Sequence, residues 1–175
     1  MFIASSLSSK CYRATWIQTG IKHLSYRVAV GTEAAIEQVT AVTDELVKAY
    51  ERLLPQLSRT ADADEKTLAR VVTSSATTLL IARQGGQVVG MCALVTFCIP
   101  TGVRSWIEDV VVDESARGQG IGSALVEAAV RLARDAGARS VDLTSRPERA
   151  EANLLYQRLG FDRRDTNVYR FQLDT

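Results

Sequence analysis

The sequence of 175 residues has few of the residues that build disulfide frameworks and metal centres. It contains one histidine, His23, and three cysteines, Cys11, Cys92 and Cys98, which follow no metal-ligand spacing. An odd number of scattered cysteines also argues against a disulfide scaffold. We therefore expect no bound metal, and reduced thiols of the kind typical of a cytoplasmic protein.

A strong net charge and a long hydrophobic run are also missing. Lysine and arginine number 21 and aspartate and glutamate 20, so the net charge is +1. This balance gives no support for a global attraction to nucleic acid or to a charged membrane surface. The richest apolar stretch, residues 88–99, is too short to cross a membrane as a helix. We expect neither nucleic acid nor membrane as a partner.

The chain is long enough for one domain with a proper core, and its start differs in composition from the rest. Residues 1–32 contain no acidic residue, and residues 5–9 are rich in serine. We interpret residues 1–24 as an atypical N-terminal extension and residues 25–175 as a single domain. An organelle transit peptide is an alternative for the extension, although its amphipathic pattern is weak.

From residue 26 onward the pattern predicts alternating strands and helices. Thr32 is expected to cap a first helix, which Pro55 ends. Gly85 and Gly86 predict a hairpin turn, while Gly137 and Gly160 predict helix ends. Strands are expected over residues 26–30, 77–83, 87–96, 104–112 and 140–144, with one or two closing strands in 161–173. Helices are expected over about residues 32–54, from Asp62 or Asp64 through Val72, over about 119–136 and over about 149–159. This order predicts an α/β fold in which a mixed sheet is covered by helices on both faces.

A glycine-rich turn is the most informative motif in the sequence. Arg117-Gly118-Gln119-Gly120-Ile121-Gly122 follows an apolar strand and opens an apolar-periodic helix. Glycines let backbone N–H groups close on a phosphate without interference from a Cβ atom. The positive end of the helix dipole points to the same place. The motif therefore predicts a site for a phosphate-bearing ligand.

Three other interpretations of this turn were considered. A dinucleotide fingerprint would place a third glycine where Ser123 stands, and would lie in the first strand–helix–strand unit. A phosphate loop of an NTPase would require a lysine that the motif does not have. A turn that only packs a helix against a sheet is the third alternative.

A second motif decides between them. Residues 149–161, which read RAEANLLYQRLGF, resemble the closing helix of the GNAT superfamily of N-acetyltransferases. Residues 117–122 resemble the acyl-CoA signature [R/Q]-x-x-G-x-[G/A] of the same superfamily. The resemblance covers about residues 26–173 in element order. It implies a GNAT-like acyl-CoA N-acyltransferase fold with a central mixed, mostly antiparallel sheet and one splayed parallel strand pair.

The resemblance also implies a set of site residues. The strand before the turn would pair its backbone with the pantetheine arm of acetyl-CoA, through Val110, Val111 and Val112. Tyr156 would donate a proton to the departing CoA thiolate, and Asn153 would bond the pantetheine arm. Many members carry asparagine where this chain has Arg149. The pyrophosphate would lie among the amides of Gly118, Gln119, Gly120, Ile121, Gly122 and Ser123, with Arg117 adding positive charge.

The chemistry requires a base as well, because only a neutral amine attacks a thioester. Glu108 and Asp109 occupy adjacent strand positions and lie on opposite faces unless a bulge intervenes. Glu108 would share a face with Trp106 and Val110, and it resembles family glutamates that accept the proton through water. We favour Glu108 as the base, with a structural carboxylate as the alternative. Cys98 is expected to be a small residue at a strand end and not a nucleophile.

These inferences predict an N-acetyltransferase that moves an acetyl group from acetyl-CoA to a primary amine, expected to belong to a small molecule. An acceptor amine on a protein, another acyl donor, and a non-catalytic CoA-binding sensor are the alternatives. A homodimer is left open. The segments expected to build the acceptor site are the first helices and residues 54–64 and 98–104, and they do not name the acceptor.

Overall fold

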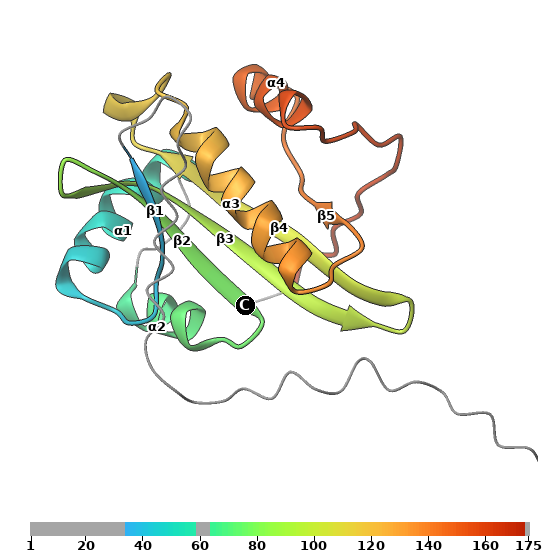
Figure 1. Ribbon diagram of the computed structural model, residues 1–175, viewed down its shortest axis with the longest axis horizontal. Helices are drawn as coiled ribbons and strands as arrows, with labels where there is room; N and C mark the ends of the chain where they lie inside the picture. The colour runs from blue at the N-terminus through green and yellow to red at the C-terminus, as the bar shows by residue number, and fades with distance from the viewer. Residues whose placement is uncertain (1–33, 59–63, 174–175) are drawn as a thin grey trace, which may run out of the picture.

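The computed structural model describes residues 34–58 and 64–173. The expected extension, the strand expected over residues 26–30, and the candidate caps Thr32 and Asp62 lie outside them. The described elements are β1 (Ala35–Gln38), α1 (Asp44–Leu57), α2 (Glu65–Thr73), β2 (Thr77–Gln84), β3 (Gln87–Ile99), β4 (Gly102–Val112), the short 3-10 helix η1 (Glu114–Ala116), α3 (Ile121–Asp135), β5 (Val141–Asp142) and α4 (Ala150–Arg158) (Figure 1).

The five strands form one sheet in the order β1-β2-β3-β4-β5. Neighbouring strands are antiparallel from β1 to β4, whereas β4 and β5 are parallel. The connection from β4 to β5 runs through α3, as a parallel pair requires. This arrangement confirms the predicted mixed sheet with helices on both faces.

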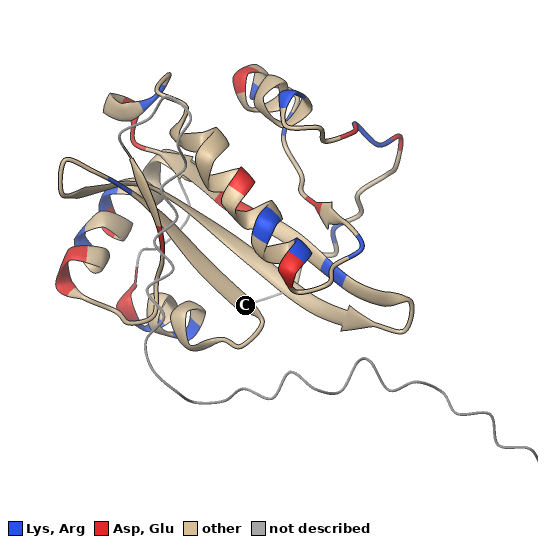
Figure 2. Cartoon of the chain, viewed as in Figure 1, with Lys and Arg blue, Asp and Glu red and all other residues tan. Residues whose placement is uncertain are grey.

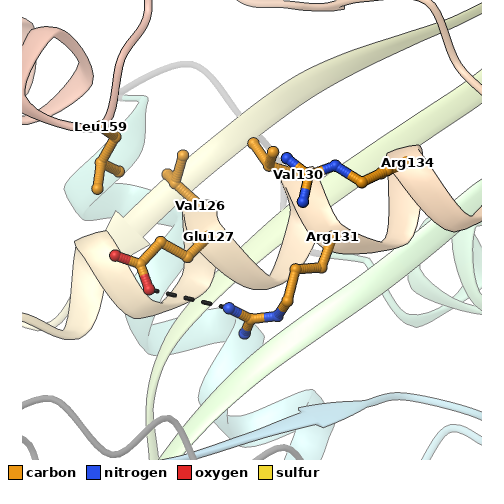
Figure 3. Close-up of a pocket in the computed structure, with 6 residues that line it drawn as sticks. All are labelled: Val126, Glu127, Val130, Arg131, Arg134 and Leu159. Atoms are coloured by element: carbon orange, nitrogen blue, oxygen red, sulfur yellow. Dashed lines mark ion pairs between the residues drawn. The ribbon is translucent and has the colours of Figure 1, made fainter.

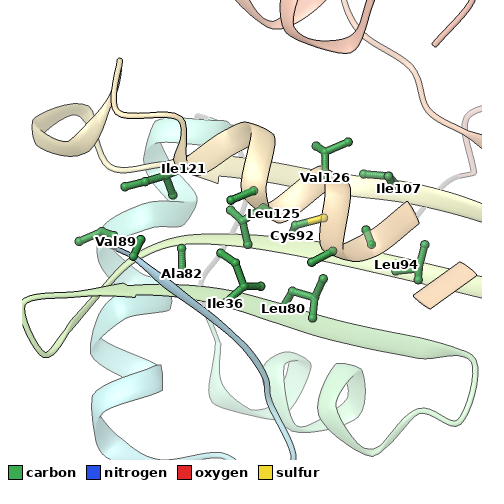
Figure 4. Packing of buried hydrophobic residues seen from close by; sticks show 14 of the residues in the cluster. Ile36, Leu80, Ala82, Val89, Cys92, Leu94, Ile107, Ile121, Leu125 and Val126 are labelled. Atoms are coloured by element: carbon green, nitrogen blue, oxygen red, sulfur yellow. The ribbon is translucent and has the colours of Figure 1, made fainter. Parts of the chain in front are cut away.

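Each face of the sheet has its own core. On one face, α3 packs over the central strands, and Ile36, Cys92 and Leu125 are buried there (Figure 4). On the other face, α1 and α2 cover a second cluster that includes Leu53 and Met91. β3 runs through the middle of the sheet and carries no charged residue, and charges gather on the helices and in residues 161–173 (Figure 2). The sheet is thus buried on both faces, as its apolar strands predict.

The start of the first helix was predicted wrongly. Residues 35–38, which were expected in that helix, form β1, and Ile36 pairs with Ala82 of β2. α1 begins at Asp44, where the Thr43 hydroxyl accepts a hydrogen bond from the Leu46 N–H at 3.2 Å. The apolar spacing fits either structure, and the pairing of Ile36 with β2 decides between them.

The end of this helix was also predicted wrongly, because Pro55 lies inside α1 and the helix continues to Leu57. A proline removes one backbone hydrogen bond, which here would join its nitrogen to the carbonyl of Glu51. Both residues are exposed, so water can satisfy that carbonyl.

Most local signals in the rest of the chain are confirmed. Asp64 caps α2, and its carboxylate accepts a hydrogen bond from the Lys66 N–H at 2.7 Å. Gly85 and Gly86 both have positive φ in the turn between β2 and β3. Gly137 and Gly160 also have positive φ after α3 and α4, as predicted for residues that end helices.

The closing strands expected in residues 161–173 are absent, since this part of the structure contains no helix or strand. The side chains of Val168, Tyr169, Phe171 and Leu173 are 71–88% exposed. β5 is also shorter than expected, with two residues paired to β4. A β-prone sequence forms a strand only where a partner edge continues beside it, and β5 offers too little edge. Among the described helices, none combines the length and the apolar character needed to span a bilayer.

Candidate active site

A β-bulge in β4 lies at the centre of the candidate site. Ala93 of β3 pairs with Glu108 and Met91 pairs with Val111, so Asp109 and Val110 together face the single residue Cys92. Asp109 has a φ of 53°, in the left-handed region. The extra residue reverses the alternation of side chains along the strand.

After the bulge, each side chain of β4 points to the face opposite to the one that strict alternation would give it. Ile107 and Val110 both pack in the cluster under α3, although they are three positions apart, and Val111 packs in the cluster under α1 and α2. Glu108, next to Ile107, therefore belongs to the α1 side and is exposed. The expectation that Glu108 shares a face with Val110 is wrong, because the bulge lies between them.

Beyond the bulge, β4 has an open backbone edge. β4 and β5 pair only at Ser105 with Val141 and at Trp106 with Asp142, and β4 continues to Val112. The Asp113 N–H donates to the Val89 carbonyl of β3 at 2.8 Å. Alternation then directs the backbone groups of Val111 toward β3 and those of Val110 and Val112 toward the open edge.

The glycine turn follows directly. Gly118 and Gly120 have φ values of 76° and 78°, and Gly120 is the N-cap of α3 without a capping side chain. α1 and α2, in contrast, are capped by the side chains of Thr43 and Asp64. The first-turn N–H groups of Ile121, Gly122 and Ser123 lack an intrahelical acceptor. This helix start is therefore suited to an anion.

Two side chains hold the turn in place. The Arg117 Nε atom donates to the Val112 carbonyl at 3.2 Å, and its Nη2 atom reaches Gln56 Oε1 at 3.4 Å. The Gln119 side-chain oxygen accepts a hydrogen bond from Gln84 Nε2 at 2.9 Å. The turn is thus attached to β4, to α1 and to the hairpin, and the Arg117 guanidinium lies beside the glycines.

Gly122 allows α4 to approach α3 and β4. A Cβ atom on Gly122 would lie 3.2 Å from Leu155 Cδ1 and 3.8 Å from Val112 Cγ2. A larger residue would push Leu155 away, and α4 with it. Gly122 therefore lets Leu155, and α4 with it, lie close to α3 and to Val112 at the end of β4.

Tyr156 is half-buried against the cluster under α3, and its ring meets that of Phe161 edge-on with centroids 6.0 Å apart. Burial raises the pKa of the Tyr156 hydroxyl above its usual 10.0, Cys92 raises it further, and Arg149 lowers it. Since Cys92 faces the bulge, Tyr156 and the bulge belong to one site. The hydroxyl keeps its proton at neutral pH and can donate it.

Asn153 and Arg149 both bond the backbone of this region. Asn153 Nδ2 donates to the Arg146 carbonyl at 3.0 Å, so this nitrogen is engaged in the entry to α4. Arg149 is the N-cap of α4, and its Nη2 atom donates to the Leu57 carbonyl at 3.0 Å. The Arg149 contact joins α4 to the end of α1 across the site. No pattern in the sequence predicted this contact.

Asp109 is the residue that sequence reasoning missed. The residue is exposed, yet partial desolvation raises the pKa of its carboxyl, and Arg149 opposes this shift. Tyr50 of α1 interacts electrostatically with Asp109. Burial of the Tyr50 side chain raises the pKa of its hydroxyl, and the negative charge of Asp109 raises that pKa further. The neighbouring acidic residues at positions 108 and 109 were a signal, but the sequence does not locate a bulge.

Neither of the two cysteines in the described part of the chain, Cys92 and Cys98, offers a nucleophile at this site. Burial raises the pKa of Cys92 to about 12, so its thiol stays protonated at neutral pH. Cys98 is exposed near the far end of β3. Within residues 34–58 and 64–173, no group of three His, Cys, Asp or Glu side chains is placed to hold a metal ion.

A shallow pocket of about 180 Å³ lies elsewhere, on the outer face of α3 beside the end of α4 (Figure 3). It is lined by Val126, Glu127, Val130, Arg131, Arg134 and Leu159, and Glu127 pairs with Arg131 at 3.9 Å. None of the predicted site residues lines it. Its one carboxylate is already paired with Arg131, and Arg134 is the remaining charged group in the lining.

Comparison with known proteins identifies the family. The model of the Acetyltransferase (GNAT) family matches residues 39–161, which include the bulge, the glycine turn and Tyr156. The chain belongs to this family. The resemblance noted in the sequence is thereby confirmed.

Individual relatives agree with this assignment. N-acetyltransferase family 8 member 2 of Rattus norvegicus is 36% identical over 85 residues, which span 47% of this chain and 38% of the rat protein. The match thus covers little more than a third of that relative.

Solved structures share the fold at lower identity. A putative acetyltransferase from Agrobacterium tumefaciens has a TM-score of 0.68 at 22% identity, and the match covers 77% of this chain and 99% of that one. Glucosamine-6-phosphate N-acetyltransferase from Arabidopsis thaliana has a TM-score of 0.66 at 18% identity, over 79% and 97%. An aminoglycoside N-acetyltransferase in complex with CoA has 0.68 at 18%, over 83% and 98%.

Proposed function

We propose that this protein is an N-acetyltransferase that moves the acetyl group of acetyl-CoA to a primary amine of a small molecule, by direct attack in a ternary complex. One arrangement carries the proposal: the uncapped start of α3, the open edge of β4 and Tyr156 of α4 meet around the bulge. Family membership and a fold shared with a CoA complex support the choice of donor. The amine acceptors named for two neighbours support a small-molecule amine.

The residues fit acetyl-CoA. The amides of residues 118–123 and the charge of Arg117 suit its pyrophosphate, because Gly118 and Gly120 expose the backbone and no side chain caps α3. The open backbone groups of Val110 and the N–H of Val112 suit the amides of the pantetheine arm, whereas the Val112 carbonyl already accepts a hydrogen bond from Arg117. Val111 directs its own backbone groups toward β3 and would contribute less. Asn153 retains its side-chain oxygen for the same arm.

Bound acetyl-CoA would supply the thioester carbonyl that the amine attacks. In our proposal, the N–H of Val110 on the open edge stabilises the charge that develops on the carbonyl oxygen. Glu108 accepts the amine proton through water, and the Tyr156 hydroxyl donates a proton to the sulfur as the thiolate leaves. Holding both reactants side by side supplies much of the acceleration.

The test is a thiol-release assay with acetyl-CoA across a panel of amines, combined with Tyr156→Phe. Loss of a positioned acid lowers kcat by about 10²–10⁴-fold, and the Kd for CoA from calorimetry should stay unchanged. Tyr169→Phe is the matched control, because Tyr169 is 88% exposed in residues 161–173. Since burial raises the pKa of Tyr156 above the usual tyrosine value, the wild-type rate should show no tyrosine-dependent fall near neutral pH.

Full activity of Tyr156→Phe would refute the acid role of this tyrosine. Absence of CoA binding to the wild type would remove the whole donor assignment, whereas CoA binding without thiol release from any amine would favour a sensor. A cytoplasmic location and a homodimer stay predictions, which cell fractionation and sedimentation can check.

A further inference from the structure

Asp109 stands out among the described residues by its backbone conformation, and the residue is exposed at the bulge. Within the described part of the chain, it is the one non-glycine residue with positive φ. Its carboxylate takes part in no hydrogen bond or ion pair with those residues. The bulge thus holds a charged group at the site without engaging it in the fold.

The charged and titratable groups around Asp109 come from each element packed near the bulge. α1 contributes Tyr50, β3 contributes Cys92, and the N-cap of α4 contributes Arg149. Asp64, at the start of α2, adds negative charge on the Tyr50 side. Cys92 is neutral and buried, so Arg149 is the one positive neighbour among these groups.

Arg149 leaves the Asp109 carboxylate available. Its guanidinium donates to the Leu57 carbonyl at 3.0 Å, and it forms no ion pair with Asp109 within 4.0 Å. Arg149 and Cys92 also influence Tyr156, so Asp109 and the proposed acid share two neighbours. α1 packs on β4, where Tyr50 and Val111 belong to one cluster. In our proposal the acceptor approaches the thioester from this side and meets the Asp109 carboxylate, which pairs with no described residue.

We propose that Asp109 binds the ammonium group of the acceptor beside the ring of Tyr50, and that the acceptor is accordingly an aliphatic primary amine. This inference rests on the proposed function and specifies its acceptor side. A carboxylate attracts the protonated form of the amine, and an aromatic ring next to it adds a cation–π contact. Binding comes before the ammonium loses its proton, which in our scheme passes to Glu108.

Asp109→Asn tests the charge with the backbone preserved, because asparagine tolerates the left-handed region about as well as aspartate. We expect the KM for phenethylamine and glucosamine to rise 10–100-fold, on the order of one charge-assisted contact, with a smaller change in kcat. The KM for aniline, which is neutral at pH 7, should stay within about twofold, because no ammonium is recognised. Asp135→Asn, at the far end of α3, is the matched control and should change neither value.

Two further measurements narrow the result. Tyr50→Phe keeps the ring and should retain most of the affinity for the amines, whereas Tyr50→Leu should raise their KM severalfold. Acid should weaken amine binding at a higher pH than for an ordinary aspartate, because the protonated carboxyl does not hold an ammonium. Asp109→Asn should abolish that pH dependence.

The outcomes separate this inference from the proposed function. A wild type that turns over amines, with an Asp109→Asn variant that keeps the wild-type KM or loses affinity equally for aniline, overturns the inference alone. A wild type without turnover overturns the proposed function. In that case, ligand-observed NMR on the CoA-loaded protein tests the subsite directly: phenethylamine binding that Asp109→Asn removes supports the inference, and no binding or unchanged binding overturns it.

Discussion

The glycine turn gives a sharp prediction, because the chain contains its own control. Gly118 and Gly137 have φ values of 76° and 75°, and an added Cβ on either would meet no atom within 4 Å. Gly118 belongs to the proposed pyrophosphate turn, whereas Gly137 follows the opposite end of α3. Replacing each by alanine imposes the same strain at two places that differ in function.

The expected magnitudes follow from the backbone. An L-residue in the left-handed region costs about 1–2 kcal/mol, and the lower entropy of the unfolded chain offsets about 0.4–1 kcal/mol of this. Both variants should thus lose about 1 kcal/mol in the free energy of unfolding, measured by urea titration. Only Gly118→Ala should weaken CoA binding. If the turn of Gly118→Ala relaxes out of the left-handed conformation, CoA binding must restore that conformation. This costs up to about 1–2 kcal/mol of binding free energy, which raises the Kd by up to about 5–30-fold.

Calorimetry with CoA on both variants decides the matter. Gly118→Ala with full CoA affinity, at the predicted loss of stability, would show that the conformation of the turn does not hold the pyrophosphate. An equal loss of CoA affinity in both variants would mean that general destabilisation of the protein causes the effect. Either result contradicts the assignment of this turn.

Two further predictions concern the stability of the frame around the site. Gly90→Ala should destabilise the protein by about 1–3 kcal/mol in urea titrations, because its Cβ would lie 3.0 Å from the Val111 carbonyl oxygen and 3.2 Å from Leu125 Cδ1; no loss would mean that β3 and α3 separate easily. Asp113→Ala should cost about 1 kcal/mol at pH 7 through its lost cap. Hydrogen bonds from Ser115 lower the pKa of Asp113 below 3.8, so this stabilisation is present above pH 3.8. The difference in stability between Asp113→Ala and wild type should vanish as the pH falls through the lowered pKa. A difference that persists at still lower pH would exclude a role of the charge.

Local signals in the sequence predicted the elements that depend on a few neighbouring residues. The hairpin at Gly85 and Gly86, the cap at Asp64 and the turn at Gly118 and Gly120 each need a residue type at a fixed position, and the structure has them there. The first helix and the closing strands were predicted wrongly for the opposite reason. Whether residues 35–38 or 161–173 form strands depends on a partner edge that lies far away in the sequence.

The sequence by itself determined the acyltransferase family and the candidate donor site, because the glycine turn and Tyr156 lie in motifs that can be read locally. Only the tertiary structure revealed the features on which the proposed acceptor side rests. The bulge depends on the register of β4 against β3, and that register places Val110 on the open edge and Asp109 in the bulge, where its charge influences Tyr50. The contact of Arg149 with Leu57 joins residues 92 positions apart. Such arrangements arise from packing between distant segments, which no short sequence pattern encodes.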